Sequence, residues 1–394
     1  MAETDVTARA KAAIAVAAGW REALDQAVAA VSPVAPDLTL LFAAWDYAEE
    51  FPDLAREAKA RLGGTVIGCS GQGIIGPRRE VEDQPALSLA CFQLPGASLS
   101  AVRITNGDVQ RRASRESWEE ALETGAEDMN GIIVFAEPYF DCEPFLIAMS
   151  GFFPGLPILG GIASGDSRTA RAAVFLDGEA YLEGAVAVVL RGDYTLRTVV
   201  SQGAAPIGEP WTITGATENI IETIGMRPAY QVLVETLMGL EPGQQLRAQQ
   251  NLLVGLAVDE YKDEFRRGDF LIRNLVGADR ERGLLAINAY PRTGQTLQFQ
   301  MRDAAAADED LRELLQRFKS EAGEGTAVGG LLCSCNGRGA GLFGAPDHDA
   351  LAVADMLGDV PVAGFFCNGE IGPIGQRTFL HGFTASLGLI VRKP

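Results

Sequence analysis

The sequence predicts an α+β protein in which repeated βαβ units, each followed by antiparallel strands, form mixed sheets flanked by helices. The main observation is an internal repeat, found at Leu38–Gly76, Gly131–Arg168 and Ala327–Gly375. Each copy has an apolar strand, a polar loop, a helix of about three turns and a second strand ending in a Gly-rich loop, the pattern of a βαβ unit. The second observation is composition: 394 residues, 47% hydrophobic and 22% charged, are enough for two or three domains with real cores. The fold is therefore expected to be pseudo-symmetric.

The first element expected along the chain is an Ala-rich amphipathic helix over residues 1–35. Its front is acidic, and Ala and Val recur with helical spacing past Arg21 and Asp25, which disfavours a signal peptide. Two domains are expected to follow, over residues 36–227 and 228–394. Their linking region is expected near Ile207–Arg227.

The remaining segments are assigned from their periodicity. Alternating or continuous apolar runs after the first two copies predict antiparallel strands, and helices are expected near residues 114–124 and 308–319. A helix near 228–238 and the strands up to residue 302 are interpreted as a degenerate fourth copy. The stretch Pro144–Gly165 carries no charge, but its prolines and glycines favour a buried helix and strand over a membrane span.

Charge and cysteine content limit the function. The net charge of −19 disfavours binding to nucleic acid and to anionic membrane surfaces. Six cysteines in so long a chain do not form a disulfide framework, and most of them lie in apolar runs typical of buried thiols. We expect a cytoplasmic protein.

Three strings of residues carry a resemblance to a known family. They are GCSGQG at 68–73, FFCNGEIGP at 365–373 and LHGFTASLGLIV at 380–391. Together they resemble the FIST family, over about residues 36–391. The resemblance implies an intracellular sensory protein with N- and C-terminal modules, not an enzyme. It would bind a small ligand such as an amino acid and act on a separate signalling protein, for example a histidine kinase or a cyclase.

Ligands of parallel βαβ units bind beyond the carboxyl ends of the strands, close to helix N-termini. This rule and the family strings select a set of candidate ligand-binding residues: Cys69, Ser70, Gly71, Asn336, Gly337, Arg338, Cys367, Asn368, Gly369 and Glu370. Arg338 suits a carboxylate and Glu370 an ammonium group, so the pair suits a zwitterion. The alternative is a structural Arg338–Glu370 salt bridge. The ligand is expected between the two halves of the chain or in the C-terminal βαβ unit, and replacing Arg338 by Ala is expected to abolish binding with little unfolding.

Other chemistries are less well supported. The two G-x-G-x-x-G strings, at 71–76 and 339–344, lack the immediate strand-to-helix turn of a dinucleotide site. Cys333, Cys335, Cys367 and His381 lack the second paired motif of a structural zinc site, so no metal and no cofactor are expected. His348 and His381 have no triad-like context. Two alternatives stay open: an interaction scaffold without a small ligand, and a haem-binding gas sensor with His348 or His381 as the axial ligand, since some family members are reported to bind haem.

Overall fold

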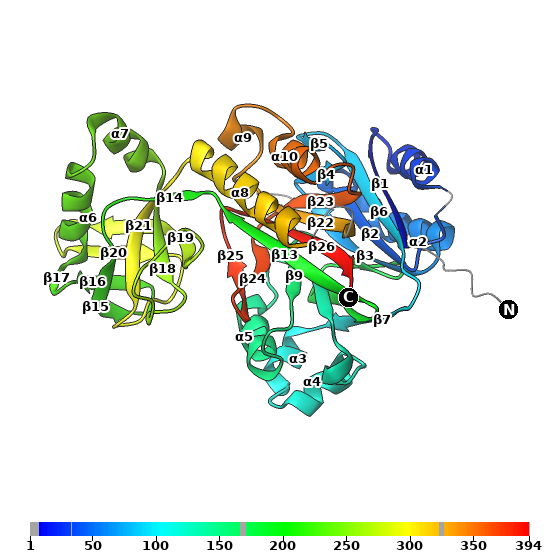
Figure 1. Cartoon of the computed structure of the whole chain (residues 1–394), viewed down its shortest axis with the longest axis horizontal. Coiled ribbons are helices and arrows are strands. Elements are labelled where there is room, and N and C mark those ends of the chain that lie inside the picture. The colour runs from blue at the N-terminus through cyan, green and yellow to red at the C-terminus, as the bar shows by residue number, and fades with distance from the viewer. Residues whose placement is uncertain (1–7, 33, 166–170, 323–326, 394) are drawn as a thin grey trace. The chain divides into compact units, whose positions relative to one another are not determined.

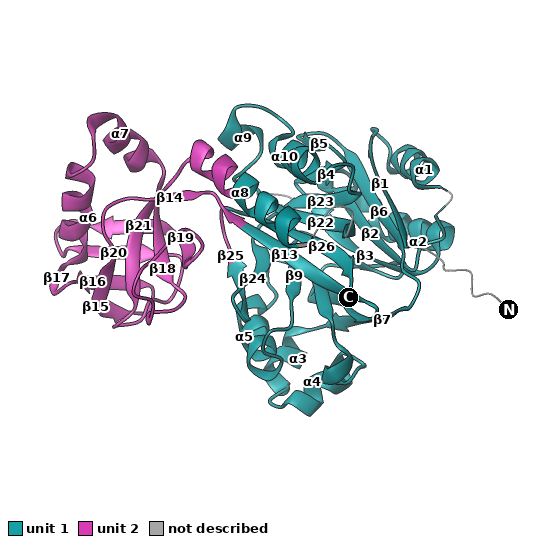
Figure 2. Ribbon diagram, in the orientation of Figure 1, with its two compact units in different colours: residues 1–200, 311–380, 384–394 teal, residues 201–310, 381–383 magenta. Residues whose placement is uncertain are grey.

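The chain folds into two compact units. The computed structural model describes residues 8–32, 34–165, 171–322 and 327–393 (Figure 1). The first unit holds residues 1–200, 311–380 and 384–394, and the second holds residues 201–310 and 381–383 (Figure 2). The second unit is thus inserted into the sequence of the first, and this division crosses the boundary expected at residue 227.

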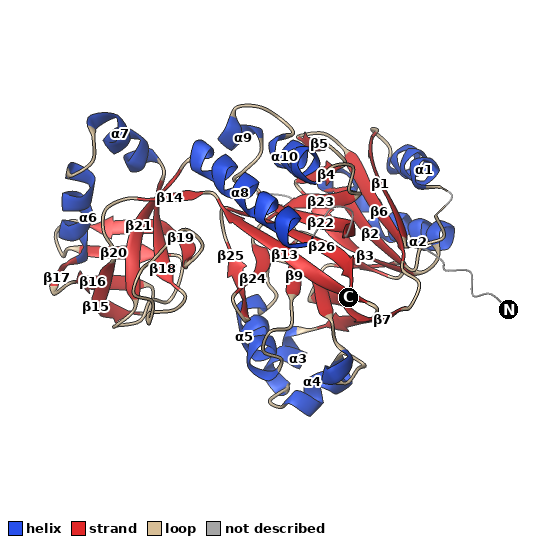
Figure 3. Cartoon of the chain, viewed as in Figure 1, coloured by secondary structure: helices blue, strands red, loops and turns tan. Residues whose placement is uncertain are grey.

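The first unit is built on the three repeats. Each repeat forms two neighbouring parallel strands joined by a helix, as the sequence predicts (Figure 3). The three sets are β2 (Leu38–Ala44), α2 (Phe51–Leu62) and β3 (Thr65–Gly71); β8 (Gly131–Ala136), α5 (Cys142–Phe152) and β9 (Ile158–Ile162); and β22 (Ala327–Cys335), α10 (His348–Leu357) and β23 (Val362–Cys367). The α+β class and the internal repeats are confirmed. Residues 166–168, which end the second repeat, lie outside the described residues.

Each parallel pair lies at the centre of a six-stranded mixed sheet. The sheet orders are β1-β6-β2-β3-β10-β11, β25-β24-β9-β8-β12-β7 and β13-β26-β22-β23-β4-β5. The flanking strands are β1 (Arg9–Val16), β4 (Gly73–Gly76), β5 (Arg79–Glu82), β6 (Ala86–Gln93), β7 (Ala97–Ile104), β10 (Val174–Leu176), β11 (Glu179–Tyr181), β12 (Ala185–Gly192), β13 (Tyr194–Gln202), β24 (Glu370–Ile374), β25 (Arg377–His381) and β26 (Thr384–Arg392).

The three sheets exchange hairpins in a cycle. The hairpin β4–β5 follows β3 in sequence but pairs with β23 of the third repeat. The hairpin β10–β11 follows the second repeat and pairs with β3, and the hairpin β24–β25 follows the third repeat and pairs with β9. Each repeat therefore completes the sheet of another, and this places segments far apart in sequence side by side.

Glycines at one equivalent position allow the parallel strands to approach. A Cβ atom on Gly68, Gly160 or Gly364 would lie 1.7, 1.7 or 1.8 Å from a carbonyl oxygen of the partner strand in its own repeat. Only glycine fits such an approach. Beside these positions, the rings of Phe42, Phe135 and Phe365 contact one another in the shared core, with centroids 5.1–5.7 Å apart.

Helices cover the outer faces of these sheets. Buried residues of α1 (Trp20–Val31) and α2 share a core with β1, β2 and β6, while α5 shares one with β8 and β12. Residues of α8 (Ala304–Ala322) and α10 pack with β22, β23 and β26. The short helices are η1 (Trp45–Glu50), α3 (Asn106–Arg111), α4 (Arg115–Ala121), η2 (Ala126–Asp128) and α9 (Ala340–Phe343).

The N-terminal helix expected over residues 1–35 is only partly right. Residues 20–31 form α1, but Arg9–Val16 form the edge strand β1, antiparallel to β6. The segment alternates small apolar and larger side chains, a pattern that is compatible with a strand as well as with a helix. Its non-local pairing with β6 decides between them. Residues 1–7 and 33 lie outside the described residues.

The second unit is an antiparallel barrel rather than a fourth βαβ copy. Its elements are β14 (Ala204–Pro206), β15 (Trp211–Thr217), β16 (Ile220–Ile224), β17 (Arg227–Pro228), α6 (Ala229–Met238), α7 (Pro242–Gln250), β18 (Leu252–Ala257), β19 (Phe270–Asp279), β20 (Leu284–Ile287) and β21 (Thr296–Arg302). Strand β21 pairs with both β15 and β18, which closes the barrel. The strands of this unit pair antiparallel with their neighbours. Antiparallel strands do not need the crossover helix that joins the parallel strands of a βαβ unit.

The charge-free stretch Pro144–Gly165 forms most of α5 and strand β9, both packed into the core as expected. Within the described ranges, no helix is long and apolar enough to cross a membrane.

Candidate functional site

The first group of predicted site residues, Cys69, Ser70 and Gly71, ends strand β3 inside the protein. Cys69 and Ser70 are fully buried. The Ser70 hydroxyl donates to the carbonyl oxygen of Ser164 at 2.8 Å and accepts from the Ala173 N–H at 2.9 Å. These contacts join the end of β3 to the segments that follow β9, so the Ser70 hydroxyl has a structural role.

The second group lies where β22 and β23 end, at the partly exposed edge of the third repeat. Cys335 and Cys367 are register partners in the parallel ladder. Beyond them, the Asn336 amide nitrogen donates to the side-chain oxygen of Asn368 at 2.8 Å. The Asn336 N–H is held by the Cys367 carbonyl at 3.0 Å. The loops that carry Asn336, Gly337, Asn368 and Gly369 are therefore brought together, as the predicted strand pairing requires.

Arg338 pairs with Asp349 instead of the expected Glu370. Its Nε and Nη2 atoms donate to the two carboxylate oxygens of Asp349, at 2.7 and 2.8 Å, and both side chains are 1% exposed. The side chain of Ser334 donates to the same carboxylate at 2.6 Å. Burial alone would raise the pKa of Asp349, but the Arg338 guanidinium and these hydrogen bonds hold that pKa well below its usual range.

This pairing corrects two expectations. The predicted Arg338–Glu370 salt bridge is replaced by a two-point Arg338–Asp349 pair, because Asp349 stands in the first turn of α10 and faces the loop after β22. Removing Arg338 would leave the buried Asp349 carboxylate uncompensated. Replacing Arg338 by Ala is therefore expected to destabilise the protein strongly rather than to spare it.

Glu370 is fully buried at the start of β24, close to the end of β23. It accepts from the Cys367 thiol at 3.1 Å and from the Thr384 N–H at 3.0 Å. Burial raises its pKa to about 8, more than the hydrogen bonds and the nearby Arg338 charge lower it. This raised pKa favours the neutral carboxylic acid form of the side chain.

Glu80 on β5 adds a third buried carboxyl group, which reaches α10 through the exchanged hairpin. One of its oxygens accepts from the Ala350 N–H at 2.9 Å, while its own N–H donates to Asp347 at 2.6 Å. Burial, together with the charge of Asp349, raises the pKa of Glu80 to about 8. One cation thus faces three carboxyl groups, and only Asp349 is strongly held in its charged form.

Both halves of the chain match known family domains. Residues 37–227 match the FIST N domain, and residues 229–373 match the FIST C domain. The chain belongs to the FIST family. FIST domains are sensory domains in signal transduction. Glu80 comes from the FIST N domain, and Arg338, Asp349 and Glu370 come from the FIST C domain, so the polar cluster joins both family domains within the first compact unit.

Similar proteins are found in mycobacteria. An uncharacterized protein of Mycobacterium tuberculosis is 38% identical over 367 residues, covering 90% of this chain and 91% of that protein. An uncharacterized protein of Mycobacterium bovis is 37% identical over 378 residues, or 94% of each. Among solved structures, a cyanuric acid hydrolase from A. caulinodans covers 98% of this chain and 100% of that chain, with 10% identity and a TM-score of 0.39.

Two residues of the polar cluster, Asp349 and Glu80, were missed from the sequence. Asp349 was not selected because acidic residues are common in the first turn of a helix, where they interact favourably with the helix dipole. Glu80 was not selected because its position in the cluster depends on pairing between its hairpin and a strand almost 300 residues further along the chain. Each of them lies among other charged residues, so its own segment did not single it out.

Three buried polar atoms of the polar cluster and the adjoining loop have no hydrogen-bond partner within the part of the chain that the structure describes. They are Nη1 of Arg338, the side-chain oxygen of Asn336 and Oε2 of Glu80. Buried polar atoms are nearly always paired in native proteins, so such atoms point to water or a ligand.

The histidine nearest the polar cluster, His348, is fixed by contacts with Phe343 and Asp349. The His348 ring stacks on Phe343, with ring centroids 3.4 Å apart, and its Nδ1 lies 3.0 Å from Asp349. His381 is buried at the end of β25 and belongs to the second compact unit.

Proposed function

We propose that this FIST protein is a sensory protein that binds a small polar metabolite, such as an amino acid, at the ends of β22 and β23. The family supports a sensory role in signal transduction, and the polar cluster supports the place of binding. The ligand is bound and not converted. Its binding state is passed to a separate signalling protein such as a histidine kinase or a cyclase, in the cytoplasm.

The observation that carries the proposal is that the loop after β22 holds two buried atoms without a partner among the described residues, a donor of Arg338 and an acceptor of Asn336. Nη1 of Arg338 is a charged donor suited to a carboxylate oxygen. The Asn336 side-chain oxygen is an acceptor suited to an ammonium or amide N–H. A ligand with both groups would satisfy two atoms that are costly to bury unpaired.

The candidate residues have different roles in this proposal. Asn336, Gly337 and Asn368 form the accessible edge, and Arg338 and Glu370 lie behind it. Cys367 and Gly369 hold Glu370 and the loop backbone in place. Cys69, Ser70 and Gly71 support the fold at the exit of the first repeat and do not touch the ligand.

The neutral form of Glu370 fits this arrangement. A protonated carboxyl group can donate a hydrogen bond to a ligand oxygen, whereas a second buried anion would repel it. An anionic ligand group near Arg338 therefore needs Glu370 to stay protonated. Binding of a carboxylate ligand is expected to weaken as pH rises through about 8.

The test is thermal unfolding of the full chain against a panel of amino acids and small organic acids. A ligand at a hundred times its dissociation constant adds about 2.7 kcal/mol, which moves the midpoint by several degrees. Asn336→Ala and Asn368→Ala are expected to remove this shift, because both remove side chains at the accessible edge. Asn288→Ala, an exposed residue of the barrel, is the matched control and is expected to keep the shift.

Two results would count against the proposal. One is a panel that shifts nothing, which favours the alternative of a protein-interaction scaffold. The other is a ligand whose shift survives in both variants, which places binding elsewhere. A sensor also requires that the ligand binds one conformation more tightly than another, since only that difference changes an output.

A further inference from the structure

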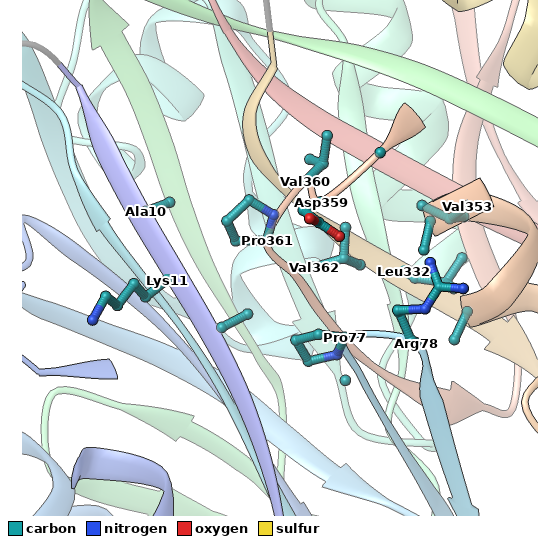
Figure 4. Close-up of a pocket in the computed structure, with 15 residues that line it drawn as sticks. Ala10, Lys11, Pro77, Arg78, Leu332, Val353, Asp359, Val360, Pro361 and Val362 are labelled. Carbon is teal, nitrogen blue, oxygen red and sulfur yellow. The ribbon is translucent and has the colours of Figure 1, made fainter. Parts of the chain in front are cut away.

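A cavity of about 290 Å³ lies in the first compact unit and adjoins the polar cluster through Ala350, whose N–H donates to Glu80. It is bounded by β1 and the β4–β5 turn on one side, and by α10 and the start of β23 on the other (Figure 4). Most of its lining is aliphatic and includes Pro77, Leu332, Val353, Val360, Pro361 and Val362. Its volume is near the lower end of the range that holds small molecules.

The cavity and the polar cluster meet at Ala350 of α10, but different side chains of the helix serve each of them. Asp349, in the first turn, binds Arg338. Val353 and Ala354, about one turn later, line the cavity. The cavity lining contains none of the side chains of the polar cluster, so the two can be changed by separate substitutions.

Three charged side chains line the cavity: Lys11, Arg78 and Asp359. Two of them already have partners. Arg78 forms an ion pair with Asp355 at 2.9 Å, and the Lys11 ammonium donates to the carbonyl oxygen of Ser32 at 2.6 Å. Asp359 has no ion-pair partner among the residues that the structure describes. Figure 4 shows its carboxylate among the aliphatic lining residues, while the Lys11 ammonium points away from them.

The surroundings of Asp359 favour a cation. Helix α10 ends at Leu357, and Gly358 caps it by donating to the Ala354 carbonyl at 2.9 Å. The C-terminal end of a helix carries partial negative charge, which adds to that of the Asp359 carboxylate. The net charge of −19 also concentrates cations near the protein.

We propose that this cavity binds a primary amine with an aliphatic body, a ligand site separate from that of the polar metabolite. The alkyl body fills the space between β1 and α10. The ammonium group pairs with Asp359 beside the end of α10. Both parts are needed, because the walls alone do not select for charge and an exposed carboxylate alone binds an ammonium group weakly.

The experiment is calorimetric titration of the full-length protein with hexylamine, hexanol and hexanoate at low salt. Hexylamine is expected to bind most tightly of the three. Asp359→Asn is expected to weaken hexylamine binding by about two- to fivefold, because the ion pair that it removes is exposed. Ala354→Leu, which fills the cavity with a good helix former, is expected to abolish binding. Asp128→Asn removes the same charge from an exposed site outside the lining and is expected to leave hexylamine binding unchanged.

The alternatives give different results. Tighter binding of hexanoate would overturn the proposal in favour of an anion site based on Lys11 and Arg78. Equal binding of hexanol and hexylamine would show that Asp359 plays no part. Absence of hexylamine binding, or binding that persists in a folded Ala354→Leu protein, would also overturn it. Asp359→Asn keeps the test valid if Ala354→Leu does not fold, because Asp359 is exposed.

Discussion

The first and third repeats share a backbone but bury opposite kinds of side chain beyond their first strand. In the first repeat, Trp45 and Phe51 pack edge to face, and the Tyr47 hydroxyl donates to the Ala17 carbonyl at 2.5 Å. In the third repeat, the corresponding region buries the Arg338–Asp349 pair next to Glu370. Buried charge costs more than buried aromatic surface, so the third repeat retains groups that stability alone does not favour. Such groups are typical of functional sites.

The largest expected effect tests what the repeats share. Gly68→Ala and Gly364→Ala are each expected to prevent folding, because the new Cβ would lie within 1.8 Å of a carbonyl oxygen in the first and third repeats alike. Soluble yield and circular dichroism are the measurements. Gly151→Ala in α5 is the control: it has open space and should be neutral or stabilising by up to ~1 kcal/mol. If only one of the two variants failed to fold, the repeats would not share this constraint.

The next prediction tests the charge that distinguishes the third repeat. Asp349→Ala leaves the Arg338 guanidinium buried without its partner and is expected to cost ~3–5 kcal/mol of unfolding free energy. Denaturant titration measures this loss. The matched control, Asp355→Ala, breaks an exposed pair with Arg78 and should cost ~1 kcal/mol or less. Equal losses would show that burial of the Arg338 pair has no special energetic role.

The pH dependence of stability should also distinguish the third repeat. The pKa of Glu370 rises on folding from its ordinary 4.5 to about 8, mainly through burial. Between these values the folded protein holds a proton that the unfolded chain has released, so stability present below pH 4.5 is lost as pH rises toward 8. A tenfold difference in proton affinity between the folded and unfolded chain corresponds to about 1.4 kcal/mol.

The corresponding measurement is the free energy of unfolding at pH 5, 6.5 and 8. Glu370→Gln should flatten this profile, leaving the slope due to Glu80, whose pKa is raised in the same direction. Glu127→Gln, an exposed substitution, should not change the slope. A wild-type profile that rises from pH 5 to 8 would contradict the neutral state assigned to Glu370.

The smallest expected effect on stability concerns Ser70, at the end of β3 in the first repeat. Ser70→Ala is expected to cost ~1–3 kcal/mol, because the Ala173 N–H loses its acceptor inside the protein. It should not change the affinity for a ligand that binds at Asn336 and Asn368. The exposed substitution Ser320→Ala should change stability by less than ~0.5 kcal/mol. Loss of ligand affinity in Ser70→Ala would extend the site to the first repeat.

Periodicity was enough to predict the three βαβ units, because apolar strands, helix lengths and Gly-rich strand ends are local features. It also placed Asn336, Arg338, Asn368 and Glu370 in one region, since carboxyl ends of paired parallel strands must meet. The partner of Arg338 could not be predicted, because several carboxyl groups lie within reach and only packing selects Asp349. Strand β1 and the barrel were missed for a related reason. Their pairing partners, not their own residues, decide their conformation.

The exchanged hairpins also affect how the chain must acquire its structure. The hairpin β4–β5 is made early in synthesis, but its partner β23 lies almost 300 residues later. Until β23 is made, the edge of this hairpin is open to pairing with other chains. Long-range pairing of this kind slows folding and prolongs exposure to aggregation. A ribosome-bound chain that ends before β22 is therefore expected to need chaperones, even though two of its three repeats are complete.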